Sequence, residues 1–548
     1  MTVKQDTIPL ALYLWRRIAS LGIEHVFGVP GDFNLEMIDH VYSVPGLKWL
    51  GTCNELNGAY AADGYTRIKG TPGVVLTTYA VDELSAMNGV AGAYAEHAGM
   101  IHVVGMPARH FQEKRTLLHH TLEPNMDQTT TFVEMSKPIR KTFAILNNEE
   151  TATQKVDRAF IKCVRSRLPV FIYVPTDVVN ILVDAQSLNT PLDTVVRNSD
   201  SGAETLVVEK ILKALKDAPR PAIVADVLAT RHGGQDFTRR FVNVTQFQTY
   251  ATQMSKGIID EDISFPGIKD AAEASDLIIT IGPLLSDSNT GRFTRKIVAD
   301  KAIVLAHDYC QVFREKPHYW TKIKTPLLSE SKSGTVTQDY LWQRIGRFLK
   351  PNDILFAEVG TTQFGIIDAT FPANTRFNTQ MFWSSIGFSV PATLGACIAA
   401  KEMRLPGRVV LIVGDGSLQM TVQEVGSFIR FGLKPIIFVI NNDGYSIERA
   451  IHGPGQQYND ISPQWDYQKM LEFFGAKGSG TGTSNGVMSR SSYCSSIEDV
   501  ERIIGSEEFG RCECIELCEI RMDKLDYPWR LKASRKLARA AMAAMASK

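Results

Sequence analysis

The sequence has few cysteines, no net charge and no long apolar segment. Eight cysteines among 548 residues are too few for a disulfide framework, so we expect free thiols and a cytoplasmic protein. Lys+Arg and Asp+Glu both number 59, and this balance does not favour nucleic acid or an anionic membrane as a partner. No apolar run reaches the roughly 20 residues that cross a bilayer. The first 22 residues mix charged and apolar side chains, so we expect an amphipathic helix rather than a signal peptide.

The one dense group of cysteines comprises Cys512, Cys514 and Cys518, in RCECIELCEI. A structural zinc site requires four ligands and usually contains a C-x-x-C pair, which this group lacks. Small thiols are also common in the protein interior. A buried strand is therefore the better interpretation of this segment.

The length and the patterning of the chain predict three α/β domains. Residues 1–185 alternate strand-like and helix-like segments, which indicates a parallel sheet with helices on both faces. Residues 204–330 form a middle domain with strands at RPAIVADV and DLIITIGPLLSD, and with neither a phosphate loop nor a cluster of titratable residues. Residues 340–548 form a third domain that ends in a helix rich in alanine and lysine. Polar linkers are expected at 186–203 and 329–338.

The most informative stretch is a predicted strand–helix–strand unit in the third domain. An apolar run from Val409 to Val413 predicts a buried strand that ends in the letters GDG. Apolar residues then recur at helical spacing up to Gly432, and a second apolar run, Pro435 to Ile440, ends in NNDG. Parallel sheets bind ligands at the carboxyl ends of their strands. We therefore expect Asp415 and Asn442 to lie side by side at that edge.

Asp415 and Asn442 have the chemistry of a metal site. A carboxylate, an amide oxygen and a nearby backbone carbonyl are hard ligands that suit Mg²⁺ or Ca²⁺. Gly416 and Ser417 open the intervening helix, whose free N–H groups favour a phosphate. The pattern therefore predicts a metal bridged to a diphosphate. GDG alone also fits an ordinary strand–helix–strand unit with turn residues at its strand ends, but GDG followed by NN after one helix is more specific.

The GDG and NN pattern, followed by SIERAIHGPGQQYN, resembles the thiamine-diphosphate motif of the pyruvate/indolepyruvate (2-oxo acid) decarboxylase family. The resemblance extends over nearly the whole chain. It implies three doubly wound α/β domains (pyrimidine-binding, middle and diphosphate-binding), with thiamine diphosphate and Mg²⁺ as cofactors. It also implies non-oxidative decarboxylation of a 2-oxo acid to an aldehyde and CO₂. The metal ligands implied by the resemblance are Asp415, Asn442 and Gly444.

The resemblance also assigns five candidate catalytic residues. Glu55, where a strand gives way to a helix, would otherwise be an acidic residue near a helix N-terminus, worth only a few tenths of a kcal/mol. It matches the glutamate that hydrogen-bonds the aminopyrimidine ring and promotes deprotonation of the thiazolium. Asp32, His119, His120 and Glu448 match a polar cluster for proton transfer and aldehyde release. From the residues alone, Asp32 is a turn or N-cap residue and the histidines are a surface or loop pair.

Further matches concern how the cofactor is held. Ile386, in FWSSIGFSVPA, matches the large apolar residue that keeps the cofactor bent, although by composition alone it is a core residue. Gly360 and Thr361, in EVGTTQFG, match the loop beside the pyrimidine, and Ser384 supplies a backbone carbonyl. In this family Glu55 and the diphosphate site of one active site belong to different subunits. We therefore expect a homodimer at least, and a homotetramer as a dimer of dimers. The full cofactor-binding set is Glu55, Gly360, Thr361, Ser384, Ile386, Asp415, Gly416, Ser417, Asn442 and Gly444.

The chain departs from the family pattern near the cofactor. TTYAVDELSA has Ala80 and Asp82 where the family usually has the glycines of TTFGVGELSA, and Ser384 occupies a position where glycine is common. An added carboxylate and an added Cβ in a tight loop are expected to change its geometry or its charge.

A second group of departures concerns the substrate pocket. Ser288 occupies the position of a bulky aromatic residue in pyruvate-specific members, Gln363 replaces a small residue, and Ile451 completes the expected pocket. The hypothesis is a substrate larger than pyruvate, such as phenylpyruvate, indolepyruvate or a branched 2-oxo acid. VADVLATRHG lacks the cysteine that family members use for substrate activation, so sigmoidal kinetics through that thiol are not expected. Two alternatives stay open, a carboligase that forms acyloins and a cofactor-binding protein without turnover.

Overall fold

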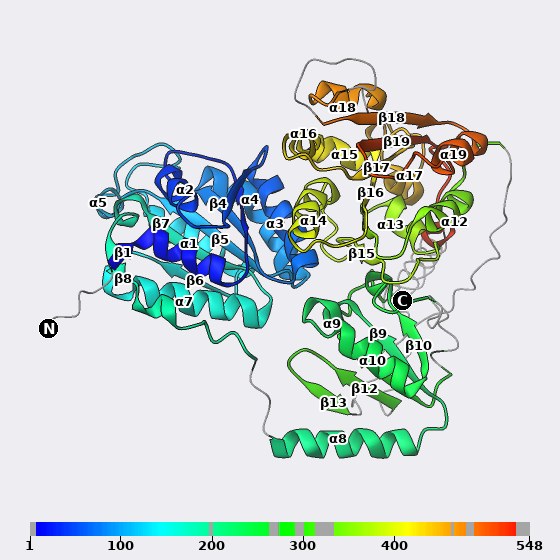
Figure 1. Cartoon of the computed structure of the whole chain (residues 1–548), viewed down its shortest axis with the longest axis horizontal. Helices are drawn as coiled ribbons and strands as arrows, with labels where there is room; N and C mark the ends of the chain where they lie inside the picture. Colours follow the sequence, from blue (N-terminus) through cyan, green and yellow to red (C-terminus); the bar gives the residue numbers. More distant parts are fainter. Residues whose placement is uncertain are drawn as a thin grey trace, which may run out of the picture. The chain divides into compact units, whose positions relative to one another are not determined.

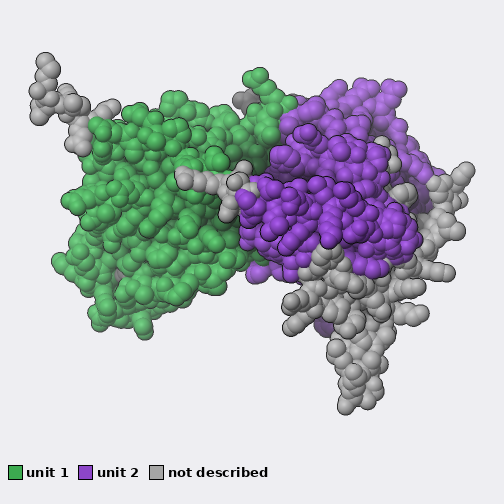
Figure 2. Space-filling view, turned by 90° about the horizontal axis from the view of Figure 1, so that it is seen from below, with its two compact units in different colours: residues 1–197, 391–404 green, residues 198–390, 405–548 purple. Residues whose placement is uncertain are grey.

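The chain divides into two compact units, which Figure 2 distinguishes by colour. Unit 1 comprises residues 1–197 and 391–404, and unit 2 comprises residues 198–390 and 405–548. The boundaries of the three expected domains stay a prediction, and the expected helix rich in alanine and lysine lies outside the described residues. The computed structural model describes residues 7–196, 201–261, 272, 274–290, 301–312, 334–461, 465–477 and 487–532.

Unit 1 is built on a six-stranded parallel sheet with the strand order β3-β2-β4-β5-β7-β6. Its central strands are buried apolar runs, as expected for a parallel sheet covered on both faces, and helices lie on both sides of it (Figure 1). A short antiparallel pair, β1 and β8, was not predicted. The strands are β1 (Thr7–Pro9), β2 (His25–Gly28), β3 (Lys48–Gly51), β4 (Gly73–Thr78), β5 (Met100–Met106), β6 (Thr142–Ile145), β7 (Val170–Pro175) and β8 (Leu182–Asp184). The helices are α1 (Leu10–Ser20), α2 (Leu35–Val41), α3 (Glu55–Lys69), α4 (Val81–Ala95), α5 (Arg109–Glu113), α6 (Gln128–Met135) and α7 (Glu149–Ser166).

Residues 391–404 belong to unit 1 because they pack closely on α3. A Cβ at Gly395 would lie 1.8 Å from the carbonyl oxygen of Ala61, so only glycine permits this approach. The Glu402 carboxylate accepts a hydrogen bond from the Tyr65 hydroxyl at 2.8 Å and forms an ion pair with Lys69. These residues come from α14 (Ser389–Glu402), which contributes to both units.

Unit 2 contains two sheets. One has the order β10-β9-β11-β12-β13, with only β13 antiparallel, and the other is parallel throughout with the order β15-β14-β16-β17-β19-β18. Together with unit 1 they confirm the predicted α/β fold class. The strands are β9 (Pro221–Ala225), β10 (Gln248–Ala251), β11 (Leu277–Ile281), β12 (Ala302–Leu305), β13 (Cys310–Val312), β14 (Ile354–Ala357), β15 (Arg376–Asn378), β16 (Val409–Gly414), β17 (Ile436–Asn441), β18 (Ser489–Cys494) and β19 (Ile515–Arg521). Besides α14, its helices are α8 (Ser201–Lys216), α9 (Val227–Arg231), α10 (Gln235–Thr245), α12 (Gln338–Phe348), α13 (Thr361–Ile366), α15 (Asp415–Thr421), α16 (Val425–Arg430), α17 (Ser446–His452), α18 (Met470–Phe473) and α19 (Ile497–Ile504).

The predicted strand–helix–strand unit is present, but its helix is broken. Strands β16 and β17 are parallel neighbours, which confirms the prediction that their carboxyl ends meet. The prediction of a single helix between these strands is wrong, because a 3₁₀ segment (Val422–Glu424) separates α15 from α16. Thr421 leaves helical geometry at φ −142° and ψ 21°, and its hydroxyl donates to the carbonyl oxygen of Gly387 at 2.7 Å. This tertiary hydrogen bond fixes the break.

Two further expectations concern titratable side chains and cysteines. The middle region was expected to have no titratable cluster, yet the rings of His232 and His307 stack with centroids 4.1 Å apart. They come from loops that are distant in sequence, so no local pattern reveals them.

Cys518 lies buried in β19, as expected, whereas Cys512 and Cys514 precede that strand. Among the described helices, none is both long enough and apolar enough to cross a membrane.

Candidate active site

Asp32, His119 and His120 lie together in unit 1. Asp32 Oδ2 is 2.8 Å from His119 Nε2, and both side chains are more than half exposed. The N-cap interpretation of Asp32 is wrong, because α2 begins at Leu35 and its N-cap residue is Asn34. The rings of the two histidines meet edge to face with centroids 4.6 Å apart. The structure thus brings together three of the five predicted catalytic residues.

Two aromatic residues that the sequence did not single out complete this cluster. The Phe33 ring lies 5.0 Å from the His119 ring and 4.9 Å from the Tyr79 ring. The Tyr79 hydroxyl donates to the backbone carbonyl oxygen of His119 at 2.5 Å. Burial, and then the charge of Asp32, raise the pKa of Tyr79 to about 12, so the hydroxyl remains a donor at neutral pH. The one available signal was the tyrosine of TTYAVDELSA, where the family pattern has phenylalanine.

His120 has an unusual environment for a loop histidine. Its φ of +72° is uncommon for a residue with a side chain. Its Nδ1 is buried and has no hydrogen-bond partner among the described residues. An unsatisfied ring nitrogen beside a carboxylate–histidine pair suits a group that takes up or releases a proton.

The turn that carries Tyr79 is strained. Ala80 has φ +59° and ψ −101°, a conformation that glycine adopts readily and alanine does not. Asp82 Oδ2 accepts a hydrogen bond from the backbone N–H of Thr78 at 3.2 Å and so closes the turn. The two departures from the family pattern thus have distinct consequences, because Ala80 adds strain and Asp82 adds a hydrogen bond.

Glu55 lies in unit 1 at the beginning of α3. Its neighbour Asn54 is the N-cap residue and accepts a hydrogen bond from the backbone N–H of Asn57 at 2.8 Å. The N-cap of α3 is therefore formed by Asn54 and not by Glu55. The side chain is half-buried at the carboxyl end of β3, which pairs with β2, the strand that leads to Asp32. Its catalytic role stays a prediction.

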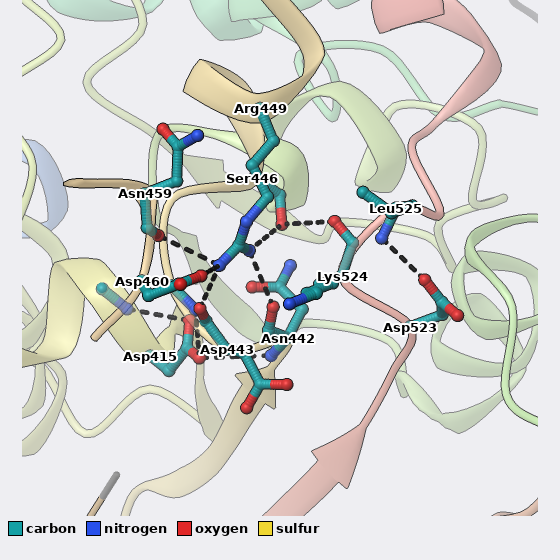
Figure 3. A network of polar contacts seen from close by, with 12 residues as sticks. Asp415, Asn442, Asp443, Ser446, Arg449, Asn459, Asp460, Asp523, Lys524 and Leu525 are labelled. Atoms are coloured by element: carbon teal, nitrogen blue, oxygen red, sulfur yellow. Dashed lines mark hydrogen bonds and ion pairs between the residues drawn. The ribbon is translucent and has the colours of Figure 1, made fainter. Parts of the chain in front are cut away.

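In unit 2, Asp415 is buried at the carboxyl end of β16. Its Oδ2 accepts hydrogen bonds from the backbone N–H groups of Asn442 at 3.2 Å and Gly444 at 2.9 Å (Figure 3). Burial raises the pKa of this carboxyl to about 7 despite these hydrogen bonds. A Cβ at Gly416 would lie 2.7 Å from the ring of Tyr445, so a larger residue does not fit beside the carboxylate.

The three predicted metal ligands fit a small divalent cation. When the amide oxygen of Asn442 faces Asp415, it lies 3.0 Å from the Gly444 carbonyl oxygen and 3.2 Å from Asp415 Oδ1. Three acceptor oxygens this close repel one another unless a cation lies between them. Oxygens on adjacent corners of an octahedron with Mg–O distances of about 2.1 Å are about 3 Å apart. Without a cation, the opposite orientation of the Asn442 amide is favourable, in which its nitrogen donates hydrogen bonds to the Gly444 carbonyl oxygen and to Asp415 Oδ1.

A buried glutamate holds the two predicted cofactor loops of unit 2 together. The Glu358 carboxylate accepts hydrogen bonds from the backbone N–H of Ser389 at 3.1 Å and from its hydroxyl at 2.7 Å. It also accepts one from the backbone N–H of Val359 at 2.9 Å, and burial raises its pKa to about 6. Gly360, at φ +112°, and Thr361 follow on this loop. The sequence showed Glu358 in EVGTTQFG but no role for it.

The loop before α14 presents Ile386. Its side chain is 40% exposed, so the core interpretation is wrong and the residue is available to a ligand. Ser384 has φ +59°, which explains why glycine is common there.

Comparisons with known proteins decide the family. Residues 9–131 match the description "Thiamine pyrophosphate enzyme, N-terminal TPP binding domain", residues 208–323 the "central domain", and residues 358–491 the "C-terminal TPP binding domain". Pyruvate decarboxylase isozyme 1 of Saccharomyces cerevisiae is 41% identical over 506 residues, 86% of this chain and 89% of the yeast protein. Pyruvate decarboxylase of Kluyveromyces lactis is 41% identical over 507 residues, with the same shares. Pyruvate decarboxylase of Candida glabrata is 38% identical over 567 residues, 97% of this chain and 98% of that protein.

The chain belongs to the thiamine-diphosphate-dependent 2-oxo acid decarboxylase family. Its cofactors are therefore thiamine diphosphate and a divalent metal, Mg²⁺. The oxygen geometry around Asp415 agrees with this family's chemistry.

The remaining predicted residues of the decarboxylase lie in unit 2. Glu448 and Ile451 are exposed on α17, and Gln363 is buried in α13. The Ser288 hydroxyl donates to Asp287 Oδ1 at 3.3 Å. Among the described residues, no hydrogen bond joins any two of Ser288, Gln363 and Ile451. Their common pocket therefore stays a prediction.

Proposed function

We propose that the chain decarboxylates a 2-oxo acid without oxidation, releasing an aldehyde and CO₂, with thiamine diphosphate and Mg²⁺ as cofactors. The observation that carries this proposal is the close approach of the Asn442 amide group, the Gly444 carbonyl oxygen and the Asp415 carboxylate, a set that suits Mg²⁺ when the amide oxygen faces Asp415. The names of the relatives, pyruvate decarboxylases at about 40% identity over most of the chain, support the same reaction.

The cofactor, when bound, supplies a carbon nucleophile and an electron sink. Asp415, Asn442 and Gly444 would hold the metal, and the Glu55 carboxylate would share a proton with the pyrimidine of the bound cofactor. The Asp32–His119 pair, with His120 next to it, holds the proton that the product carbon needs before the aldehyde leaves. Tyr79 keeps the His119 backbone in place.

Each active site combines residues of two subunits. The resemblance places Glu55 of one subunit with the diphosphate site of another, so the functional unit is a homodimer at least, and we propose a homotetramer of two such dimers. We also propose a cytoplasmic location, which the free cysteine thiols support.

The substrate class depends on Ser288. A serine in place of a bulky aromatic residue enlarges the pocket, and Gln363 fills part of that space. We therefore propose that the enzyme accepts 2-oxo acids larger than pyruvate, with phenylpyruvate, indolepyruvate and branched acids as candidates, while the relatives' names favour pyruvate.

The experiment is a product analysis on purified protein with thiamine diphosphate and Mg²⁺. Pyruvate, phenylpyruvate, indolepyruvate and a branched 2-oxo acid are supplied separately, with and without an added aldehyde, and CO₂, free aldehyde and acyloin are quantified. CO₂ with an equal amount of aldehyde is the expected result. Acyloin as the main product would make the protein a carboligase, and no CO₂ from any acid would refute the proposal. Turnover of pyruvate far above that of the larger acids would refute the pocket hypothesis alone.

A further inference from the structure

Arg449 is a buried arginine whose side chain binds the backbone of the metal-ligand loop, residues 441–445. It comes from α17, and its side chain is 0% exposed. Its Nη1 donates to the carbonyl oxygen of Asn442 at 3.0 Å, and its Nη2 donates to the carbonyl oxygen of Asp443. Figure 3 shows the guanidinium between this loop and the segment that contains Asn459 and Asp460.

The same guanidinium fastens that second segment. Nη2 donates to the carbonyl oxygen of Asn459 at 3.1 Å and to Asp460 Oδ1 at 2.6 Å. The Asn459 carbonyl also accepts the backbone N–H of Tyr445 at 2.8 Å. It lies so close to Gly444 that a Cβ there would be 2.3 Å away. Residues 459–460 therefore pack against the metal-ligand loop, and Arg449 is hydrogen-bonded to both segments.

The metal-ligand loop needs such support because its backbone is unusual. Asp443 has φ +60° and Gly444 has φ +117°. Within this turn, the Asn442 amide group lies 3.0 Å from the Gly444 carbonyl oxygen and 3.2 Å from Asp415 Oδ1. Backbone in such conformations persists only where its surroundings hold it.

Arg449 also connects this loop to a candidate catalytic group. Glu448 and Ile451 lie on α17, the short helix that carries Arg449. Because Arg449 and Glu448 are consecutive residues of this helix, a side chain that fixes the helix to the metal-ligand loop also sets the position of Glu448.

We infer that Arg449 is a positioning residue that couples Mg²⁺ binding at Asp415, Asn442 and Gly444 to the placement of Glu448; this rests on the proposed function. A planar guanidinium reaches several carbonyl oxygens at once with a fixed fork of donors. A lysine has one compact ammonium and does not hold the same set of acceptors.

The test compares Arg449→Lys with Arg408→Lys. Arg408 is a matched control, because it too pairs with a carboxylate, Asp353, and donates to two backbone carbonyl oxygens, those of Phe348 at 2.9 Å and Gly510 at 3.2 Å. It precedes β16, at the opposite end of that strand from Asp415. Mg²⁺ is titrated calorimetrically into metal-free protein that holds saturating thiamine diphosphate.

Arg449→Lys is expected to weaken Mg²⁺ binding about tenfold or more, the usual effect of losing a group that supports metal ligands. Its kcat stays low even at saturating Mg²⁺, because Glu448 is displaced. Arg408→Lys is expected to lower the melting temperature to a similar extent and to leave the Mg²⁺ affinity unchanged.

Wild-type Mg²⁺ affinity in Arg449→Lys would overturn the inference, and so would an equal loss of affinity in Arg408→Lys, since that outcome reports general destabilisation. If the wild-type protein itself binds no Mg²⁺ with thiamine diphosphate, the proposed function fails instead. If Arg449→Lys does not fold, hydrogen–deuterium exchange of the wild type provides the test. Addition of Mg²⁺ and thiamine diphosphate must then slow exchange across residues 446–461, and unchanged exchange there overturns the inference.

Discussion

Replacing Glu83 by glutamine is expected to remove a large pH dependence of stability from unit 1. Glu83 is fully buried in the first turn of α4. Its carboxylate accepts a hydrogen bond from the Tyr173 hydroxyl at 2.8 Å and another from the backbone N–H of Ala80. Burial raises the pKa of this carboxyl to about 8. The Glu83 carboxyl group is thus hydrogen-bonded to Ala80 of the strained turn that also contains Tyr79.

The sign follows from proton binding in the two states. The unfolded carboxyl ionises near its ordinary pKa of 4.5, whereas the folded one keeps its proton up to about pH 8. Between these values the folded state binds more protons, so the unfolding free energy falls by up to about 1.4 kcal/mol for each pH unit of increase. From about pH 6 to about pH 8 the wild type should lose roughly 2 kcal/mol relative to Glu83→Gln, which has no ionisation there.

Urea unfolding of both proteins at a series of pH values measures this difference. Glu358→Gln is the control, because burial raises the pKa of Glu358 only to about 6. The difference in unfolding free energy between this variant and the wild type should therefore be nearly constant above about pH 7. Unfolding free energies of the wild type and Glu83→Gln that run parallel from about pH 6 to about pH 8 would refute the reasoning.

Three further predictions concern the active site. Tyr79→Phe keeps the ring and removes the hydrogen bond to the His119 carbonyl, so kcat should fall by up to about tenfold with little change in KM; unchanged steady-state kinetics would exclude this role. Asp415→Asn removes the charged ligand, so calorimetry should find Mg²⁺ binding about 100-fold weaker, and retained affinity would contradict the metal site. Ser288→Phe narrows the expected pocket, so kcat/KM for phenylpyruvate relative to pyruvate should fall about tenfold or more. An unchanged ratio would show that Ser288 does not line the pocket.

Local patterns in the sequence were sufficient to predict the sheet edge at which Asp415 and Asn442 lie. The apolar run from Val409 and the one that follows it are local features, and a strand–helix–strand unit permits only one relation between their ends. The proximity of Asp415 and Asn442 was therefore predictable. The family resemblance selected Asp32, His119 and His120, and the structure places these three residues together.

The break after Thr421 and the support of the loops were not predictable in this way. Thr421 bonds Gly387, Tyr79 bonds His119, and Glu358 bonds Ser389, and in each case the partners are more than 25 residues apart in sequence. Nothing in the spacing of one partner identifies the other.

The sequence by itself determined the α/β class, the parallel strands and the types of ligand at their ends, because apolar periodicity and turn residues act over a few positions. Only the tertiary structure decided which buried side chains bind the loops that contain those residues, such as Arg449, which donates hydrogen bonds to the carbonyl oxygens of Asn442 and Asp443. A buried polar group must find its partners wherever the folded chain brings them, and that requirement is met in three dimensions rather than along the sequence.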